Sequence, residues 1–289
     1  MRESIADASL AGRRLDQAVA ELSGLGLRGA RRLISEGAIT LNGKKSLKSA
    51  RLRQGDVICQ TESPYSGPGA RLIGRQGDYC FFFKPGGLHT AALAGGGKPS
   101  LEAQLPYLCE ANNLAVPSLL QRLDHGTSGL VCAAFGNDAA RAWRNWQKEG
   151  KCRKFYFALL SGSLARPLLV RNAIIAGAKK SRLAASEADP LRWTSIEPLW
   201  QGDLAGYGAV TLARCAIKSG QRHQIRVHAA GCGHPLAGDS LYGASGDRGY
   251  KLAHYRLDFP GHSMTCRDEE LAGMFPWLAC EMENSGCIS

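Results

Sequence analysis

"QRLDHGTSG", residues 121–129, is a polar loop between two apolar runs, of which the second continues as "LVCAAF". Gly126 and Gly129 can bend such a loop tightly, because glycine adopts backbone conformations that other residues avoid. By position alone, Asp124 is more often a turn-capping residue than a functional one. Its meaning depends on what surrounds it.

Short apolar runs separated by turns surround this loop from residue 72 onward. They are "YCFFFKPGG", "LVCAAF", "KFYFALLSG", "VTLARCAIKSG" and "HQIRVHAAG". Runs of this length bounded by turn residues are typical of strands. One helix is predicted to start at Asn137 as its N-cap and to run through Trp143 and Trp146 to near Gly150. The pattern predicts an α+β domain with a mainly antiparallel mixed sheet.

A second polar cluster occupies residues 219–243, "SGQRHQIRVHAAGCGHPLAGDSLYG". Read as a strand, it places Gln224, Arg226 and His228 on one face, while the apolar residues between them pack on the other. A polar strand face along a cleft is a candidate functional surface.

The composition favours an RNA partner. The formal net charge is +11, and only residues 267–289 are acidic. A surface of that sign attracts polyanions, and nucleic acid is the first candidate. The apolar runs are shorter than the ~20 residues that cross a bilayer, and no export signal begins the chain, so we expect a cytoplasmic protein without membrane contact. The ten cysteines lack a C-x-x-C pair, which favours reduced thiols.

The N-terminal residues predict a small α/β module. One amphipathic helix fits residues 12–22, and a second fits residues 27–35 and carries Arg28, Arg31 and Arg32 on one side. A basic helix face is often merely solvated, but it can also contact phosphates.

A hairpin follows these helices. "AITLNGKK" turns at Asn42-Gly43, a strong hairpin signal, and brings in Lys44 and Lys45 before "RQGDVIC" closes the sheet. "TESPYSGPGA" then reads as a linker. We therefore predict an RNA-binding domain at 1–60, a linker at 61–71 and a larger catalytic domain at 72–289.

"RRLDQAVAEL", "RRLISEGAITLNGKK" and "RQGDVI" resemble, in this order, the small RNA-binding domain of small-subunit ribosomal protein S-four. "GLGLRG" inside this module matches the glycine pattern of dinucleotide-binding folds. It lacks the preceding strand and the acidic residue about 20 positions on that such a site needs, so no nucleotide cofactor is predicted.

The larger domain resembles the RluA-type RNA pseudouridine synthases. The matching segments are "QRLDHGTSG", "KPGG", "KFYFAL" and the stretch from "HQIRVH" to "GDSLYG". The resemblance implies the pseudouridine synthase fold and a cofactor-free isomerisation of a uridine that is flipped out of its stack. It further implies that Asp124 acts on the sugar, that Arg226 pairs with this carboxylate, and that Tyr156 stacks on the base.

The remaining site residues are predicted to contact RNA or to support the pocket. They are Arg28, Arg31, Arg32, Lys44, Lys45, Lys84, Arg122, Arg222, His223 and Gln224. Two positions depart from the family pattern, since Gln121 replaces its histidine and Gln221 its arginine. The expected partner is ribosomal RNA, with transfer RNA as the other possibility, and nothing in the sequence indicates an obligate protein partner.

Two other readings compete with this one. His223, His228, Cys232 and His234 can each bind metal, but no cysteine pair completes a zinc set, so no metal site is predicted. A catalytically silent RNA-binding or ribosome-assembly protein that retains the fold is the alternative function. The presence of Asp124, Tyr156 and Arg226 together argues against it.

Overall fold

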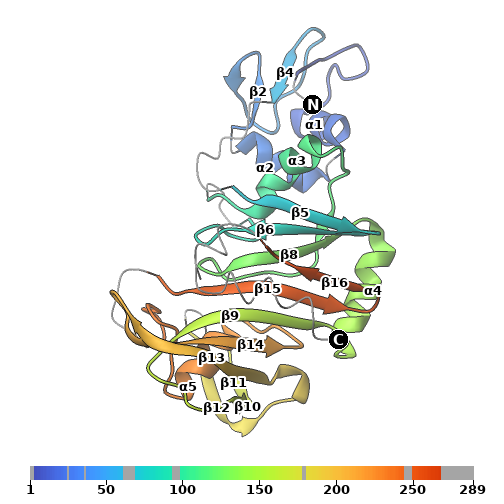
Figure 1. Ribbon diagram of the computed structural model, residues 1–289. Coiled ribbons are helices and arrows are strands. Elements are labelled where there is room, and N and C mark those ends of the chain that lie inside the picture. The colour runs from blue at the N-terminus through green and yellow to red at the C-terminus, as the bar shows by residue number, and fades with distance from the viewer. Residues whose placement is uncertain are drawn as a thin grey trace. The chain divides into compact units, whose positions relative to one another are not determined.

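The computed structural model describes residues 3–24, 26–35, 37–60, 69–92, 98–177, 180–243 and 249–267. The chain divides into two compact units. The first comprises Met1–Arg71 and Leu88–Ser118, and the second comprises Leu72–Gly87 and Leu119–Ser289. Figure 1 shows the elements of each unit with their labels.

The first unit packs helices against a small sheet. Its helices are α1 (Leu15–Ser23), α2 (Leu27–Ser35) and α3 (Leu101–Ala111). Its sheet has the order β1 (Glu3–Ile5), β4 (Val57–Gln60), β2 (Ile39–Leu41) and β3 (Lys44–Lys45). The predicted hairpin is confirmed, because Asn42 and Gly43 both have positive φ, 52° and 73°, as the turn of a two-residue hairpin requires.

Helix α3 was not predicted. Ser100 caps it by accepting a hydrogen bond from the Ala103 amide, although Pro106 lies inside the helix. The Gln104 side chain accepts a hydrogen bond of 2.8 Å from the Ala70 amide. This segment, 88–118, therefore groups with the N-terminal residues.

The second unit is built on a ten-stranded sheet with the order β10-β13-β14-β9-β15-β8-β6-β5, to which β7 and β16 add at β8 and β15. Its strands are β5 (Arg71–Gln76), β6 (Tyr79–Lys84), β7 (Ser118–Leu119), β8 (Ser128–Ala134), β9 (Arg153–Ser161), β10 (Leu168–Val170), β13 (Thr194–Leu204), β14 (Gly208–Ile217), β15 (Leu252–Phe259) and β16 (His262–Thr265). A separate hairpin joins β11 (Asn172–Ile175) to β12 (Arg182–Glu187), and a 3-10 turn spans Pro190–Arg192. The described pairings are antiparallel except for β15 with β8, which confirms the predicted mainly antiparallel α+β fold.

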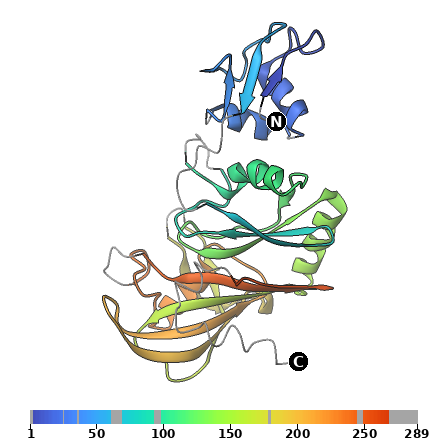
Figure 2. The same cartoon turned by 45° about the horizontal axis from the view of Figure 1, so that its top comes forward.

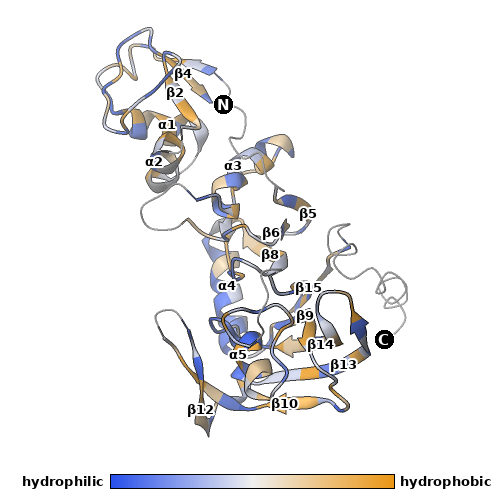
Figure 3. Ribbon diagram, turned by 90° about the vertical axis from the view of Figure 1, so that its left-hand side faces the viewer, coloured by the Kyte–Doolittle hydropathy of each residue, from blue (hydrophilic) through white to orange (hydrophobic). Residues whose placement is uncertain are grey.

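Helix α4 (Gly136–Lys148) covers part of this sheet (Figure 2). The Tyr79 hydroxyl donates to the Ala139 carbonyl at 3.0 Å, and the Trp143 ring meets Phe259 edge-on at 5.1 Å. Figure 3 shows β14 mostly in hydrophobic colours, whereas α4 is largely hydrophilic, as expected for a helix with one face on the core. The predicted helix is confirmed, but its N-cap is Phe135 rather than Asn137.

The strand predicted for "HQIRVHAAG" is wrong, because this segment is helix α5 (Gln224–Gly231). The helix is buried on all sides over residues 224–229, so no polar face marks its 3.6-residue period. What remains in the sequence is an alternation that resembles a strand. In the helix Gln224 and His228 share a face, and Arg226 points elsewhere.

No helix among the described residues is long and apolar enough to cross a membrane. The cysteines within the described ranges carry free thiols, and six of them are buried. Burial raises the pKa of the Cys80, Cys132, Cys152 and Cys215 thiols, that of Cys152 to about 11, so these four stay protonated.

Candidate active site

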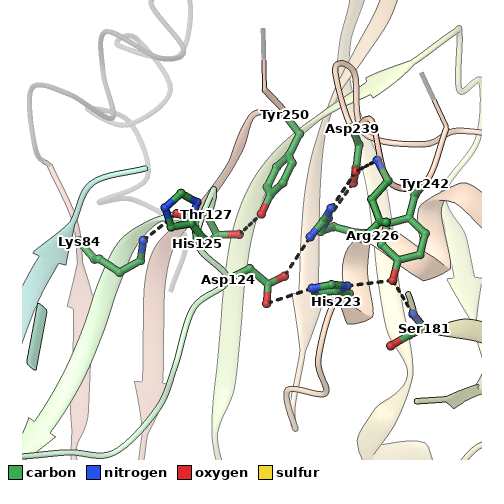
Figure 4. A network of polar contacts seen from close by, with 11 residues as sticks. Lys84, Asp124, His125, Thr127, Ser181, His223, Arg226, Asp239, Tyr242 and Tyr250 are labelled. Atoms are coloured by element: carbon green, nitrogen blue, oxygen red, sulfur yellow. Dashed lines mark hydrogen bonds and ion pairs between the residues drawn. The ribbon is translucent and has the colours of Figure 1, made fainter. Parts of the chain in front are cut away.

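The "KPGG" turn supports the loop that carries Asp124. Lys84 is fully buried, and its Nζ donates to the carbonyls of Pro85 at 2.8 Å and His125 at 3.3 Å (Figure 4). The Gly87 amide donates to the same His125 carbonyl at 2.9 Å. The lysine therefore supports the loop rather than facing solvent, and the Asp124 side chain is left 26% exposed.

Arg226 lies beside Asp124 but is held by a different carboxylate. Its Nη1 is 3.7 Å from Asp124 Oδ2, whereas its Nε and Nη2 bind both oxygens of Asp239 at 2.7 and 2.8 Å. Its guanidinium carbon also lies 4.3 Å from the centre of the Tyr250 ring and 5.1 Å from that of Tyr242. The predicted contact of Arg226 with Asp124 is present, but the buried Asp239 orients the guanidinium.

His223 approaches the other oxygen of Asp124. Its Nε2 is 4.0 Å from Asp124 Oδ1, and its Nδ1 lies 2.9 Å from the Tyr242 hydroxyl (Figure 4). That hydroxyl accepts a hydrogen bond of 2.9 Å from the Ser181 amide, so its own proton is available to Nδ1. Burial lowers the pKa of His223, and the neutral ring then presents Nε2–H to the carboxylate.

Tyr156 is buried on β9, next to Cys215 of β14 and His254 of β15. Burial raises the pKa of Tyr156, and the charge of Asp124 raises it further. The phenol therefore keeps its proton at neutral pH. Because the Asp124 charge acts on the phenol, the two side chains lie near one another in the second unit.

Three residues of this site were missed from the sequence. Asp239 and Tyr242 belong to "GDSLYG", which was matched to the family without a role for either residue. Tyr250 lies outside the matched segments, and its hydroxyl is 3.3 Å from Thr127 Oγ1. No sequence signal marked Asp239 as the partner of Arg226, because the burial of that arginine is seen only in the structure.

The predicted RNA contacts of the second unit divide into exposed and buried residues. Arg122 and Arg222 are exposed, and Arg222 also donates to the Gly177 carbonyl at 3.4 Å. Gln224 is buried, and its amide nitrogen donates to the Arg192 carbonyl at 2.8 Å and to Thr194 Oγ1 at 3.0 Å. Gln224 therefore fixes the start of α5 to β13, and its placement does not favour RNA contact.

In the first unit, Lys44 and Lys45 are exposed at the hairpin. Arg31 instead pairs with the buried Asp16 at 2.8 Å, and Arg14 binds the same carboxylate at 3.0 Å. These two arginines lower the pKa of Asp16 to about 2. The side chains of Arg28 and Arg32 lie outside the described part of the chain.

The four candidate metal ligands do not converge. Both ring nitrogens of His228 are occupied, by Thr194 Oγ1 at 2.7 Å and the Asn172 carbonyl at 3.1 Å. His234 Nδ1 lies 3.3 Å from the Ser161 carbonyl. Over the described ranges, no group of three or more His, Cys, Asp or Glu residues is placed to hold a metal ion.

Comparison with known proteins identifies two regions of the chain. The model of the S4 domain matches residues 13–58, which precede the Asp124 loop in the sequence. The model of the RNA pseudouridylate synthases matches residues 78–231, just over half of the chain. The chain belongs to the RNA pseudouridylate synthase family, which confirms both predicted resemblances.

Several curated relatives match along most of their length. The ribosomal large subunit pseudouridine synthase C of Escherichia coli is 28% identical over 258 residues, 81% of this chain and 77% of that protein. The enzyme of the same name from Vibrio vulnificus is 27% identical over 271 residues, 86% of this chain and 82% of that protein. The fold also matches human RNA pseudouridylate synthase domain containing 1, with a TM-score of 0.60 and 24% identity over 74% of this chain and 90% of that chain.

Proposed function

We propose that this enzyme converts specific uridines of ribosomal RNA to pseudouridine, with Asp124 as the reacting carboxylate. The single observation that carries the proposal is the placement of Asp124, 26% exposed, with Arg226 3.7 Å from one oxygen and His223 4.0 Å from the other. Arg226 and His223 thus flank the carboxylate, while its exposure leaves it open to a substrate.

The reaction breaks the bond between ring nitrogen 1 and the anomeric carbon, turns the uracil, and joins carbon 5 to the sugar with loss of the carbon 5 proton. Asp124 either attacks the anomeric carbon or removes a sugar proton, and both routes require the ionised carboxylate near the ribose. Tyr156 stacks on the flipped base, a role that its buried, protonated ring supports.

The RNA is bound outside the pocket by basic side chains of both units. Lys44, Lys45, Arg122 and Arg222 are exposed and can contact phosphates. We take residues 1–60 as the RNA-binding domain, 61–71 as a linker and 72–289 as the catalytic domain. The names of the E. coli and V. vulnificus relatives favour large-subunit ribosomal RNA as the substrate, and we take the cytoplasm as the place of action.

The test is to incubate the protein with unmodified transcripts of large-subunit ribosomal RNA, small-subunit ribosomal RNA and transfer RNA. Each RNA is then digested to nucleosides, and pseudouridine is separated from uridine by chromatography. Pseudouridine in the large-subunit transcript is the expected result. Tight RNA binding without pseudouridine in any transcript would instead indicate the silent RNA-binding protein.

A further inference from the structure

His254 lies between the two strands that carry the reactive groups. On β15 it pairs with Tyr156 of β9 on one side and with Gly129 of β8, at the exit of the Asp124 loop, on the other. The strands approach so closely that a Cβ on Gly129 would lie 2.2 Å from the His254 carbonyl oxygen. His254 is itself fully buried.

The imidazole makes one contact toward each of these strands. Its ring stacks on that of Tyr156, with centroids 4.6 Å apart and planes 22° from parallel. Its Nδ1 donates to the Leu130 carbonyl at 2.6 Å, the same carbonyl that accepts from the Gln121 amide nitrogen at 3.2 Å. Burial lowers the pKa of His254 to about 3, so the ring is neutral at neutral pH and packs as an aromatic group.

We infer that His254 is a positioning residue for Tyr156, whose ring plane it fixes relative to the Asp124 loop. The inference rests on the proposed function, in which Tyr156 stacks on the flipped uracil. Because His254 covers one face of the tyrosine ring, the base takes the opposite face. A tyrosine free to tilt would hold the base poorly over the Asp124 carboxylate, and small misplacements slow reactions strongly.

The test compares His254→Leu, which removes the stacked ring, with His254→Phe, which keeps a ring but not the Nδ1–H. The control is His262→Leu, since His262 also stacks on a neighbouring ring, Phe259, at 4.6 Å. We expect His254→Leu to lower kcat about 10- to 100-fold with KM nearly unchanged, because RNA affinity comes mainly from phosphate contacts elsewhere. His254→Phe should recover most of kcat, and His262→Leu should keep it.

Three results would overturn the inference: His254→Leu within about twofold of wild type, His254→Phe as slow as His254→Leu, or a KM raised as much as kcat is lowered. Thermal melts of each variant show whether it is folded at the assay temperature. The proposed function is tested separately, since its activity fails if the wild-type protein forms no pseudouridine in the ribosomal RNA transcripts.

Discussion

The substitution Asp239→Asn should destabilise the second unit strongly, because it leaves the Arg226 guanidinium without its main partner. Two hydrogen bonds, of 2.7 and 2.8 Å, join these side chains, which are 8% and 1% exposed. Removing one member of a buried ion pair typically costs about 3–5 kcal/mol. Asp124 remains 3.7 Å away and compensates in part, so we expect about 3 kcal/mol, or roughly 100-fold in the unfolding equilibrium.

Urea unfolding followed by tryptophan fluorescence measures this loss, because the tryptophans of the described residues, Trp143, Trp146, Trp193 and Trp200, belong to the second unit. The matched control is Glu197→Gln. Glu197 pairs with Arg214 at 2.6 Å, but the side chains are 48% and 44% exposed, so the loss should stay below about 1 kcal/mol. A loss for Asp239→Asn no larger than that of the control would refute the view that Asp239 holds the arginine.

Three further predictions concern the fold and the binding of RNA. The first unit should lose stability as the pH falls from about 4 to 2, since Arg14 and Arg31 lower the pKa of Asp16 from 3.8 to about 2 only when folded. Hydrogen exchange in α1 should show this loss, and Asp16→Asn should weaken the pH dependence without abolishing it, because hydrogen bonds also lower the pKa of Asp7 and Asp56. Gly129→Ala should destabilise by about 3 kcal/mol or more in urea unfolding, whereas Gly136→Ala, also at positive φ but in open space, should cost only about 1 kcal/mol. RNA affinity should fall steeply with salt in filter-binding assays, and a flat response would exclude phosphate contacts as its main source.

The sequence predicts the parts of this fold whose signals are local. Asn42-Gly43 fixes its hairpin because both residues tolerate positive φ, and the apolar stripe of α2 matches the helix observed at Leu27–Ser35. Helix α3 was missed because Pro106 lies inside it, and proline ordinarily argues against a helix interior. Burial of α5 on all sides removed the polar face that would have distinguished it from a strand.

The candidate site was predictable where a motif marks it and not where tertiary packing completes it. Asp124, Tyr156 and Arg226 come from three motifs far apart in the chain, and the structure places them in one site. Their supports, Asp239 and His254, depend on strand pairing and on the turn after α5, which no local pattern encodes. Gln224 shows the opposite error, since a polar residue in a functional motif turned out to be buried and hydrogen-bonded within the fold.

The most direct test of the central claim is the release of tritium from carbon 5 of labelled uridine in an unmodified large-subunit ribosomal RNA transcript. Wild type is compared with Asp124→Asn and with Asp138→Asn, whose carboxylate is 90% exposed on α4. We predict release by wild type and Asp138→Asn, and none above background by Asp124→Asn. Release by Asp124→Asn at the wild-type rate would contradict the assignment of Asp124 as the reacting group.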